Sequence, residues 1–336
     1  MSRFGAFRPV VVLLAALTLT AAGCTEAPTA PAPARWSSSV PGLVCPAAFT
    51  VVGVTGSAAP VSYPPPTAAG GTDVENVTCA PASGSSFSLG STLVTCRGVD
   101  RLNREAACGF VVTLESSVLS VKTFVAFGDS VTLGENALPG VGLTPLVVDL
   151  ANAYPTKLQA RFDADFPGQG VKVFNEGKSG ERATDAVARL PGVLTARQPG
   201  ALLLLDGYND LLNDGAAAVV PVSTALRDMV RLAKARGVAH VFVSTVTPSR
   251  PGQRQIGLSV ILDANFLIRQ MAAAEGAVLV DAYDAFFGQE AVLVGNDGLH
   301  LTPAGNDALA SAFYDAIRTA VPASQPDTLV PASADR

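Results

Sequence analysis

A serine directly after an apolar run is the first residue in this chain with the type and setting for chemistry. The run Val125 to Ser130 reads as a buried strand ending in Gly-Asp-Ser, a turn that presents Ser130 at the carboxyl end of a sheet. Taken alone, the tripeptide is equally typical of a helix N-terminus capped by Asp129 or Ser130. A serine hydroxyl becomes a strong nucleophile only when a base takes its proton, so the chain must also supply a base.

The chain contains two histidines that could be this base. His240 lies inside an apolar strand-like run, 238–243, where a structural side chain is expected. His300 follows Asp297 by three residues on a glycine-containing loop, a spacing that can place carboxylate and imidazole side by side. Such a carboxylate fixes the ring tautomer and stabilises the imidazolium. We therefore predict Ser130 as the nucleophile, His300 as the base and Asp297 as the acid that orients it.

Four different short blocks follow one another along the chain, separated by spacers long enough to form helices. They are Gly128-Asp129-Ser130, the run 175–180 (Asn-Glu-Gly-Lys-Ser-Gly), Gly207-Tyr208-Asn209-Asp210 and Asp297-Gly298-Leu299-His300. This set resembles the SGNH (GDSL) hydrolases, whose blocks supply Ser, Gly, Asn and Asp-x-x-His. The resemblance covers about residues 122–320.

The resemblance implies both a fold and a reaction. The fold is α/β, a flavodoxin-like three-layer α/β/α domain with a parallel sheet. The reaction is hydrolysis of a carboxylic ester through an acyl-serine intermediate, without metal or cofactor. The oxyanion donors would be the backbone N–H groups of Ser130 and Gly180 and the side-chain amide of Asn209, a neutral group with two N–H donors.

Four neighbours of these residues have less direct roles. Asp129 and Asp210 belong to the blocks, but we expect them to cap helices or bind loop amides. Glu181 and Arg182 stand where the family often has Asp and Thr, so the local loop contacts are expected to differ.

Strand and helix patterns alternate along the second part of the chain. The strand candidates are Val121–Phe127, Val171–Phe174, Ala201–Leu205, Val238–Ser244 and Ala277–Val280, and the helix candidates are Tyr154–Asp165, Ala183–Leu190, Thr224–Arg236, Leu258–Ala274 and Asn306–Ala320. Five alternations predict a parallel sheet with helices on both faces.

The preceding stretch has a different texture, with short β-type runs separated by Gly, Pro and Ser. These runs are Phe49–Val54, Val74–Cys79, Ser91–Arg97 and Gly109–Leu114. They predict a small all-β sandwich. The residues around Cys45, Cys79, Cys96 and Cys108 resemble a HYR (hyalin repeat) module, an immunoglobulin-like extracellular family.

Four of the five cysteines lie in this module, as an exported chain permits. They allow three pairings, and the sequence does not choose between them. We favour Cys45–Cys108, joining the first strand to the last, and Cys79–Cys96, joining neighbouring strands.

The N-terminus has the pattern of an export signal. Arg3 and Arg8 precede an apolar run that is too short to span a bilayer comfortably. Cys24 follows Ala-Ala-Gly and resembles the acylated cysteine of bacterial lipoproteins; ordinary cleavage with a free Cys24 is the alternative. The expected organisation is a signal peptide (1–23), a Pro/Ala-rich linker (24–40), the HYR-like sandwich (41–116), the hydrolase domain (117–320) and a polar tail (321–336). We expect a lipid anchor on Cys24 to hold the protein in the bacterial cell envelope or at the cell surface.

Composition narrows the range of partners. The net charge of −5 and the absence of blocks of like charge argue against a nucleic-acid partner. No Gly-x-Ser-x-Gly elbow of an ordinary α/β-hydrolase occurs. The alternative of another class is a surface adhesion or glycan-binding protein with an inactive hydrolase scaffold. Retention of Ser, Gly, Asn, Asp and His together disfavours it.

The substrate is the least determined feature. A Leu-, Val-, Pro- and Gly-rich segment, 134–154, follows Ser130 and is expected to line the rim of the site. Its apolar part, Leu138–Val148, would either bind an acyl chain or pack onto the domain. Because the resemblance implies a shallow site and the sandwich points to surface glycans, we expect short acyl groups, acetyl to butyryl, and small esters or acylated glycans as substrates.

Overall fold

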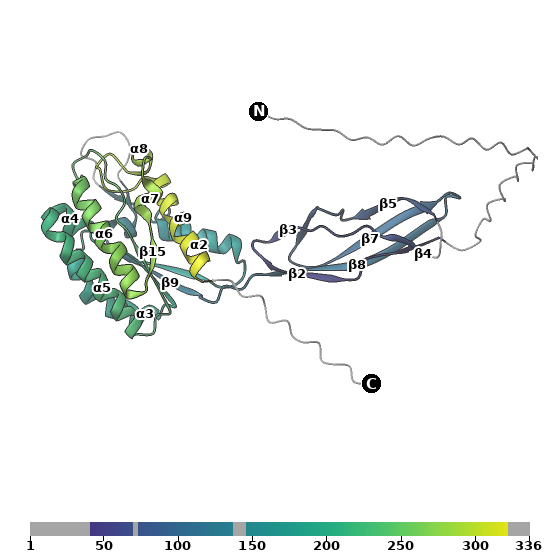
Figure 1. Ribbon diagram of the computed structural model, residues 1–336, viewed down its shortest axis with the longest axis horizontal. Coiled ribbons are helices and arrows are strands. Elements are labelled where there is room, and N and C mark those ends of the chain that lie inside the picture. The colour runs from purple at the N-terminus through teal and green to yellow at the C-terminus, as the bar shows by residue number, and fades with distance from the viewer. Residues whose placement is uncertain (1–40, 70–72, 137–145, 322–336) are drawn as a thin grey trace, which may run out of the picture. The chain divides into compact units, whose positions relative to one another are not determined.

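The computed structural model describes residues 41–69, 73–136 and 146–321 (Figure 1). The predicted signal peptide, the linker, Cys24 and nearly all of the predicted tail lie outside these residues. Within them, buried apolar side chains form two separate cores. One extends from Val54 to Leu114 and the other from Leu119 to Val321. Each core is described below by itself.

The first core belongs to an all-β region. Its strands are β1 (Gly42–Val44), β2 (Phe49–Val54), β3 (Ala58–Pro60), β4 (Thr67–Ala69), β5 (Val74–Ala80), β6 (Ser86–Ser88), β7 (Gly90–Asp100) and β8 (Glu105–Ser116). A four-stranded sheet has the order β2-β8-β7-β5, and β1-β4 and β3-β6 form two small pairs. Every pairing is antiparallel except β2 with β8. Tyr63, Phe87 and Phe110 pack edge to face at the centre.

Two disulfide bonds link this region, Cys45–Cys108 and Cys79–Cys96. They are the two pairs favoured from the sequence. Cys79 lies opposite Cys96 on neighbouring strands, and Cys96 also lies opposite Cys108. Three cysteines therefore share one row across the sheet, which is why spacing alone could not choose the partners. Disulfides of this kind are typical of exported proteins.

The second core surrounds a five-stranded parallel sheet. Its strands are β9 (Thr123–Gly128), β12 (Lys172–Gly177), β13 (Ala201–Leu205), β14 (His240–Ser244) and β15 (Val278–Val280), in the order β12-β9-β13-β14-β15. This is the flavodoxin-like order 2-1-3-4-5. Every residue of β13 is buried, as expected for a central parallel strand covered on both faces.

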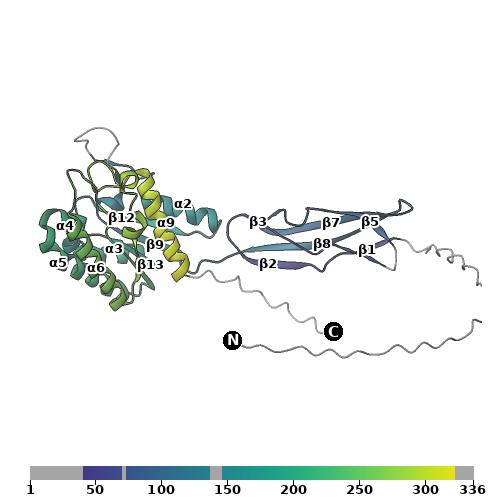
Figure 2. The ribbon, with the colours of Figure 1, turned by 45° about the horizontal axis from the view of Figure 1, so that its top comes forward.

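Helices cover both faces of this sheet (Figures 1 and 2). On one face lie α2 (Tyr154–Asp165) and α9 (Pro303–Ala320), and on the other α3 (Ala183–Arg197), α5 (Val219–Ala235) and α6 (Leu258–Glu275). The predicted α/β class is therefore correct. In the described residues, no helix combines the length and the apolar character needed to cross a membrane.

The helices α3 and α5 extend well beyond their predicted bounds, and each contains a proline in the added part. α3 continues through Pro191 to Arg197, since the buried Leu190, Val193 and Leu194 hold both halves against the core. α5 begins at Val219 rather than Thr224. Pro221 lies in its first turn, where the missing N–H costs nothing.

Short elements follow the carboxyl ends of the strands. They are α1 (Ser130–Leu133), β10 (Glu135–Asn136), β11 (Val147–Val148), α4 (Tyr208–Asp214), the 3-10 helix η1 (Gly215–Ala218), α7 (Ala282–Phe286) and α8 (Glu290–Leu293). β10 pairs antiparallel with β11. Most of the segment Leu138–Val148, which was assigned to the rim, lies outside the described residues, but Val147 and Val148 are exposed.

Candidate active site

The three residues predicted to act on an ester meet at the carboxyl edge of the sheet. Ser130 begins α1 directly after β9, and its Oγ lies 2.9 Å from Nε2 of His300. Nδ1 of the same ring lies 2.6 Å from Oδ2 of Asp297. Ser130 and His300 are only 4% and 2% exposed. When Nδ1 donates to Asp297, the lone pair of Nε2 faces the serine hydroxyl and can take its proton.

Asp297 is fixed by its own loop. Its Oδ1 accepts hydrogen bonds from the backbone N–H groups of Leu299 and His300, at 3.1 and 3.0 Å. Burial raises the pKa of Asp297, but the hydrogen bonds and charge of His300 outweigh burial and bring this pKa below its ordinary value. Asp297 is therefore ionised at neutral pH, as an acid that orients the imidazole must be.

A second loop, 249–257, supports the Asp297 loop from outside. The backbone N–H of Arg254 donates to the Asp297 carbonyl at 2.7 Å, and Ser249 Oγ donates to the Gly298 carbonyl. A Cβ on Gly252 would lie 2.3 Å from the carbonyl carbon of Asp297, so this close approach requires glycine. Arg254 Nε lies 3.7 Å from Asp297 Oδ2. The sequence reasoning missed this loop, because no motif marks it.

The predicted oxyanion donors come from the two strands that flank β9. Gly180 follows β12 with φ +69°, in the left-handed region, and it is exposed. No atom lies within 4 Å of a Cβ built at Gly180, so conformation rather than crowding favours glycine here. Asn209 follows β13, and its Nδ2 donates one hydrogen to the Glu181 carbonyl at 2.9 Å. This contact uses one of the two hydrogens of the amide.

Arg189 ties the Gly180 loop to the serine block. Its Nη2 lies 2.5 Å from Oε2 of the buried Glu181 and donates to the Gly128 carbonyl at 3.3 Å. The guanidinium also stacks over Phe127, 4.0 Å from the ring centroid. The loop contacts at Glu181 were expected to differ from those of the family, and in this structure Glu181 forms an ion pair with Arg189. The sequence did not indicate this role of Arg189, because the residue lies on a helix that carries no motif.

Three acids lie behind the site. Asp129 accepts from the Val131 N–H at 3.0 Å and caps α1. Asp210 accepts from the Ala183 N–H at 2.8 Å, at the start of α3. Burial raises the pKa of Asp129 to about 7, and burial with the nearby charge of Asp129 raises the pKa of Asp206 well above its ordinary value. Oδ2 of Asp129 and Oδ2 of Asp206 have no hydrogen-bond partner among the described residues. The two carboxyl groups therefore retain protons that exposed acids would release.

A further acid, Glu135, was not singled out from the sequence. It is 8% exposed, and its Oε2 lies 3.6 Å from Nε2 of His300. It comes five residues after Ser130 in what read as a loop, so no local pattern could have revealed the contact.

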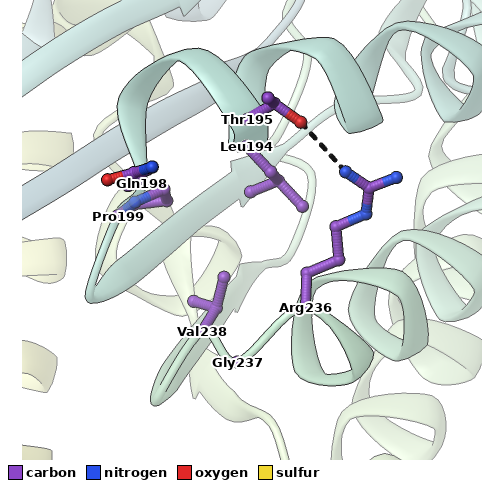
Figure 3. A pocket seen from close by; sticks show the side chains of 7 residues that line it. All are labelled: Leu194, Thr195, Gln198, Pro199, Arg236, Gly237 and Val238. Carbon is purple, nitrogen blue, oxygen red and sulfur yellow. Dashed lines mark hydrogen bonds between the residues drawn. The ribbon is translucent and has the colours of Figure 1, made fainter.

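The amino edge of the same sheet is different. His240 begins β14 there, half-buried, at the opposite end of the sheet from Ser130. A hollow of about 480 Å³ lies nearby, lined by Leu194, Thr195, Gln198, Pro199, Arg236, Gly237 and Val238 (Figure 3). Arg236 crosses it to donate to Thr195 Oγ1 at 3.0 Å. In residues 41–69, 73–136 and 146–321, no group of three His, Cys, Asp or Glu side chains is arranged to hold a metal ion.

A flavodoxin-like sheet with a Ser-His-Asp chain of hydrogen bonds at its carboxyl edge is an arrangement that suits a hydrolase, and the Ser-His-Asp constellation recurs on unrelated folds. Residues 126–308 match the GDSL-like lipase/acylhydrolase family, and residues 38–114 match the HYR domain. The first match spans more than half of the chain. The chain belongs to the GDSL-like lipase/acylhydrolase family and is a carboxylic ester hydrolase.

Solved structures share the fold of the second region. A carbohydrate acetylesterase from Sinorhizobium meliloti is 20% identical, covers 59% of this chain and 99% of its own, and has a TM-score of 0.51. A lipase/acylhydrolase from Enterococcus faecalis is 21% identical (60% and 98% covered, TM-score 0.48). An acetylxylan esterase from Geobacillus stearothermophilus is 22% identical (60% and 96%, TM-score 0.48). No curated protein matches the sequence significantly.

Proposed function

We propose that the protein is an exported serine esterase in which Ser130, His300 and Asp297 form the catalytic triad. The observation that carries this proposal is the continuous chain of contacts from Ser130 Oγ through both ring nitrogens of His300 to Asp297. Nε2 takes the hydroxyl proton while Oγ attacks the ester carbonyl carbon, and Asp297 stabilises the resulting imidazolium.

The negative charge that develops on the carbonyl oxygen requires donors that are already in place. The backbone N–H groups of Ser130 and Gly180 and the second hydrogen of the Asn209 amide would supply them. When the tetrahedral intermediate collapses, the C–O bond to the alcohol breaks, and His300 gives its proton to the departing oxygen. Water then repeats the sequence on the acyl-serine, releasing the acid and restoring Ser130.

The experiment that tests this function is hydrolysis of p-nitrophenyl acetate by the wild type and by Ser130→Ala. We expect turnover by the wild type and none above the uncatalysed rate by the variant, whose circular dichroism should be unchanged. A folded wild type without turnover of any aryl ester, acetylated sugar or phospholipid would refute the proposal.

For the substrate, we propose short acyl groups on a hydroxylated alcohol such as a sugar. The hydroxyl of Ser130 contacts the polar His300, and Gly180, on the oxyanion side, is exposed. The carbohydrate acetylesterase noted above has the same fold. The test is kcat/KM across p-nitrophenyl esters from C2 to C16: we expect a maximum at C2 to C4, whereas a steady rise to C16 would favour an acyl-binding lip that includes Val147 and Val148.

A second candidate function is surface adhesion through the first region, because residues 38–114 match the HYR domain. If the second region were only an inactive scaffold, this candidate function would not explain why Ser130, His300 and Asp297 are in contact. Glycan binding by the isolated module, with a catalytically silent full-length chain, would support it.

We further propose the organisation set out from the sequence: signal peptide 1–23, linker 24–40, sandwich 41–116, hydrolase domain 117–320 and tail 321–336, with a lipid on Cys24. The two separate hydrophobic cores support the boundary near 116. Two experiments test it. A chain beginning at Ser117 should fold and hydrolyse small esters, and a palmitate analogue should label the wild type in cells but not Cys24→Ala.

A further inference from the structure

Glu135 is a buried acid beside the candidate base that the mechanism above does not use. Its Oε2 lies 3.6 Å from His300 Nε2, and the two side chains are 9% and 2% exposed. This distance is too long for a hydrogen bond. In the resting site Nε2 faces Ser130 Oγ at 2.9 Å, so Glu135 stands next to this contact rather than replacing it.

The residue after Glu135, Asn136, is hydrogen-bonded to α9, the helix that follows His300. Asn136 is 3% exposed, and its Oδ1 accepts from Nδ2 of Asn306, 1% exposed, at 3.0 Å. Asn306 lies in the first turn of α9, and its Nδ2 also donates to the carbonyl of the N-cap residue, Thr302, at 3.2 Å. Thr302 is two residues after His300. The Asn136–Asn306 contact thus fixes the position of Glu135 relative to His300.

Among the residues that the structure describes, four charged or titratable groups face the His300 ring or its partner. Asp297 contacts Nδ1, and Glu135 approaches Nε2. Arg254 lies 3.7 Å from Asp297 Oδ2 and moderates that charge. Asp129, behind Ser130, interacts electrostatically with the ring and retains its proton up to about pH 7, because burial raises the pKa of Asp129 to about 7. Glu135 is the one of these acids placed on the Nε2 side, where the transferred proton arrives.

We propose that Glu135 is a positioning residue that stabilises protonated His300 from the Nε2 side, an inference that rests on the proposed esterase function. When Ser130 gives up its proton, the imidazolium gains an N–H on Nε2 and a positive charge 3.6 Å from the carboxylate, in a place with little water to screen it. The carboxylate holds the ring with this N–H directed into the site until the departing alcohol takes the proton.

The test combines an activity profile with a spectroscopic titration. In Glu135→Gln the acidic limb of kcat/KM against pH should move to lower pH by about one unit, the size expected for loss of an opposite charge at this distance. At the plateau, kcat should fall about 10-fold, while KM for p-nitrophenyl acetate stays within about 2-fold. Imidazole ¹⁵N NMR reads the ring without substrate: the pH at which the His300 signals are half-shifted should fall by a similar amount.

The chain supplies its own controls. His240 is the other histidine and should titrate identically in both proteins. Asp307→Asn removes one charge from an exposed position next to Asn306 and should leave the acidic limb in place. Glu135→Asp keeps the charge and should restore most of the wild-type profile, which a structural role in packing would not do.

Two outcomes overturn the proposal: an unchanged His300 titration in folded Glu135→Gln, or an acidic limb that moves equally in Asp307→Asn. If the His300 titration moves as expected but the wild type hydrolyses no ester, the electrostatic contact stands and the esterase function fails. The two hypotheses are thereby separated.

Discussion

The two edges of the parallel sheet differ in what their loops bury. At the carboxyl edge, Asp129, Glu135, Asp206 and His300 are less than a tenth exposed, whereas at the amino edge the side chains of Gln198 and Arg236 are exposed and His240 is half-buried. The amino edge has a hollow of about 480 Å³ (Figure 3). Burying ionisable groups costs folding free energy, so a chain that buries several together retains them for chemistry. Buried ionisable groups, rather than the size of a hollow, single out the carboxyl edge as the candidate functional edge.

The sharpest contrast between the edges is that between the two histidines. His300→Ala should lower kcat by about 10⁵-fold, because removing the base leaves Ser130 protonated. His240→Gln, at the amino edge, should leave kcat within about 2-fold. Both are measured on p-nitrophenyl acetate with folding checked by circular dichroism. A folded His240→Gln that is inactive would show that the wrong edge has been chosen.

Asp297→Asn should have the second-largest effect, a fall in kcat of about 10⁴-fold with KM nearly unchanged, since an amide at this position favours the wrong ring tautomer. Asp307→Asn, a surface acid on α9, is the matched control and should be neutral. Equal activity of Asp297→Asn and the wild type would remove Asp297 from the triad.

A smaller effect is expected from the support of the oxyanion donors. Arg189→Ala removes the main partner of the buried Glu181 and leaves it only the contact with the exposed Lys178, which should cost about 2 kcal/mol of unfolding free energy and lower kcat about 10- to 100-fold by displacing the Gly180 loop. Arg182→Ala removes an exposed ion pair to Asp214 and should cost less than about 1 kcal/mol. Kinetics and urea unfolding of both variants make the comparison. Equal losses in the two would show that Arg189 is an ordinary surface residue.

The contacts of Arg189 are an example of what could not be predicted from the sequence. The bounds of α2 and β13 were predicted correctly, because their apolar periodicity is local and uninterrupted. The three residues of the proposed triad could be selected because each sits in a motif, and the structure places their side chains in contact. Glu135, Arg189 and the 249–257 loop could not, since their roles arise only when segments distant in sequence meet. α3 was shortened in the prediction because packing across Pro191 is not visible in a propensity pattern.

The smallest predicted effect concerns stability. A carboxyl whose pKa is raised on folding binds its proton more tightly when folded, so its favourable contribution is complete below the unfolded pKa of about 4 and is lost as the pH rises through the folded pKa. Asp206→Asn removes a buried acid whose pKa is raised well above its ordinary value by burial, so it should raise the unfolding free energy at pH 8 and change it less at pH 4.

Urea unfolding at the two pH values measures this effect. Asp228→Asn, an exposed position on α5, is the control and should change neither value. A less stable Asp206→Asn at pH 8 would mean that the Asp206 carboxylate has a partner that offsets its burial.

The most direct test of the central claim is to find which residue forms the covalent intermediate. The full-length protein is treated with a fluorophosphonate, digested and analysed by mass spectrometry, with Ser130→Ala in parallel. We predict a single adduct on Ser130 in the wild type, loss of p-nitrophenyl acetate hydrolysis in proportion to labelling, and no adduct in the variant. Labelling of a different serine, or labelling that persists in Ser130→Ala, would contradict the account.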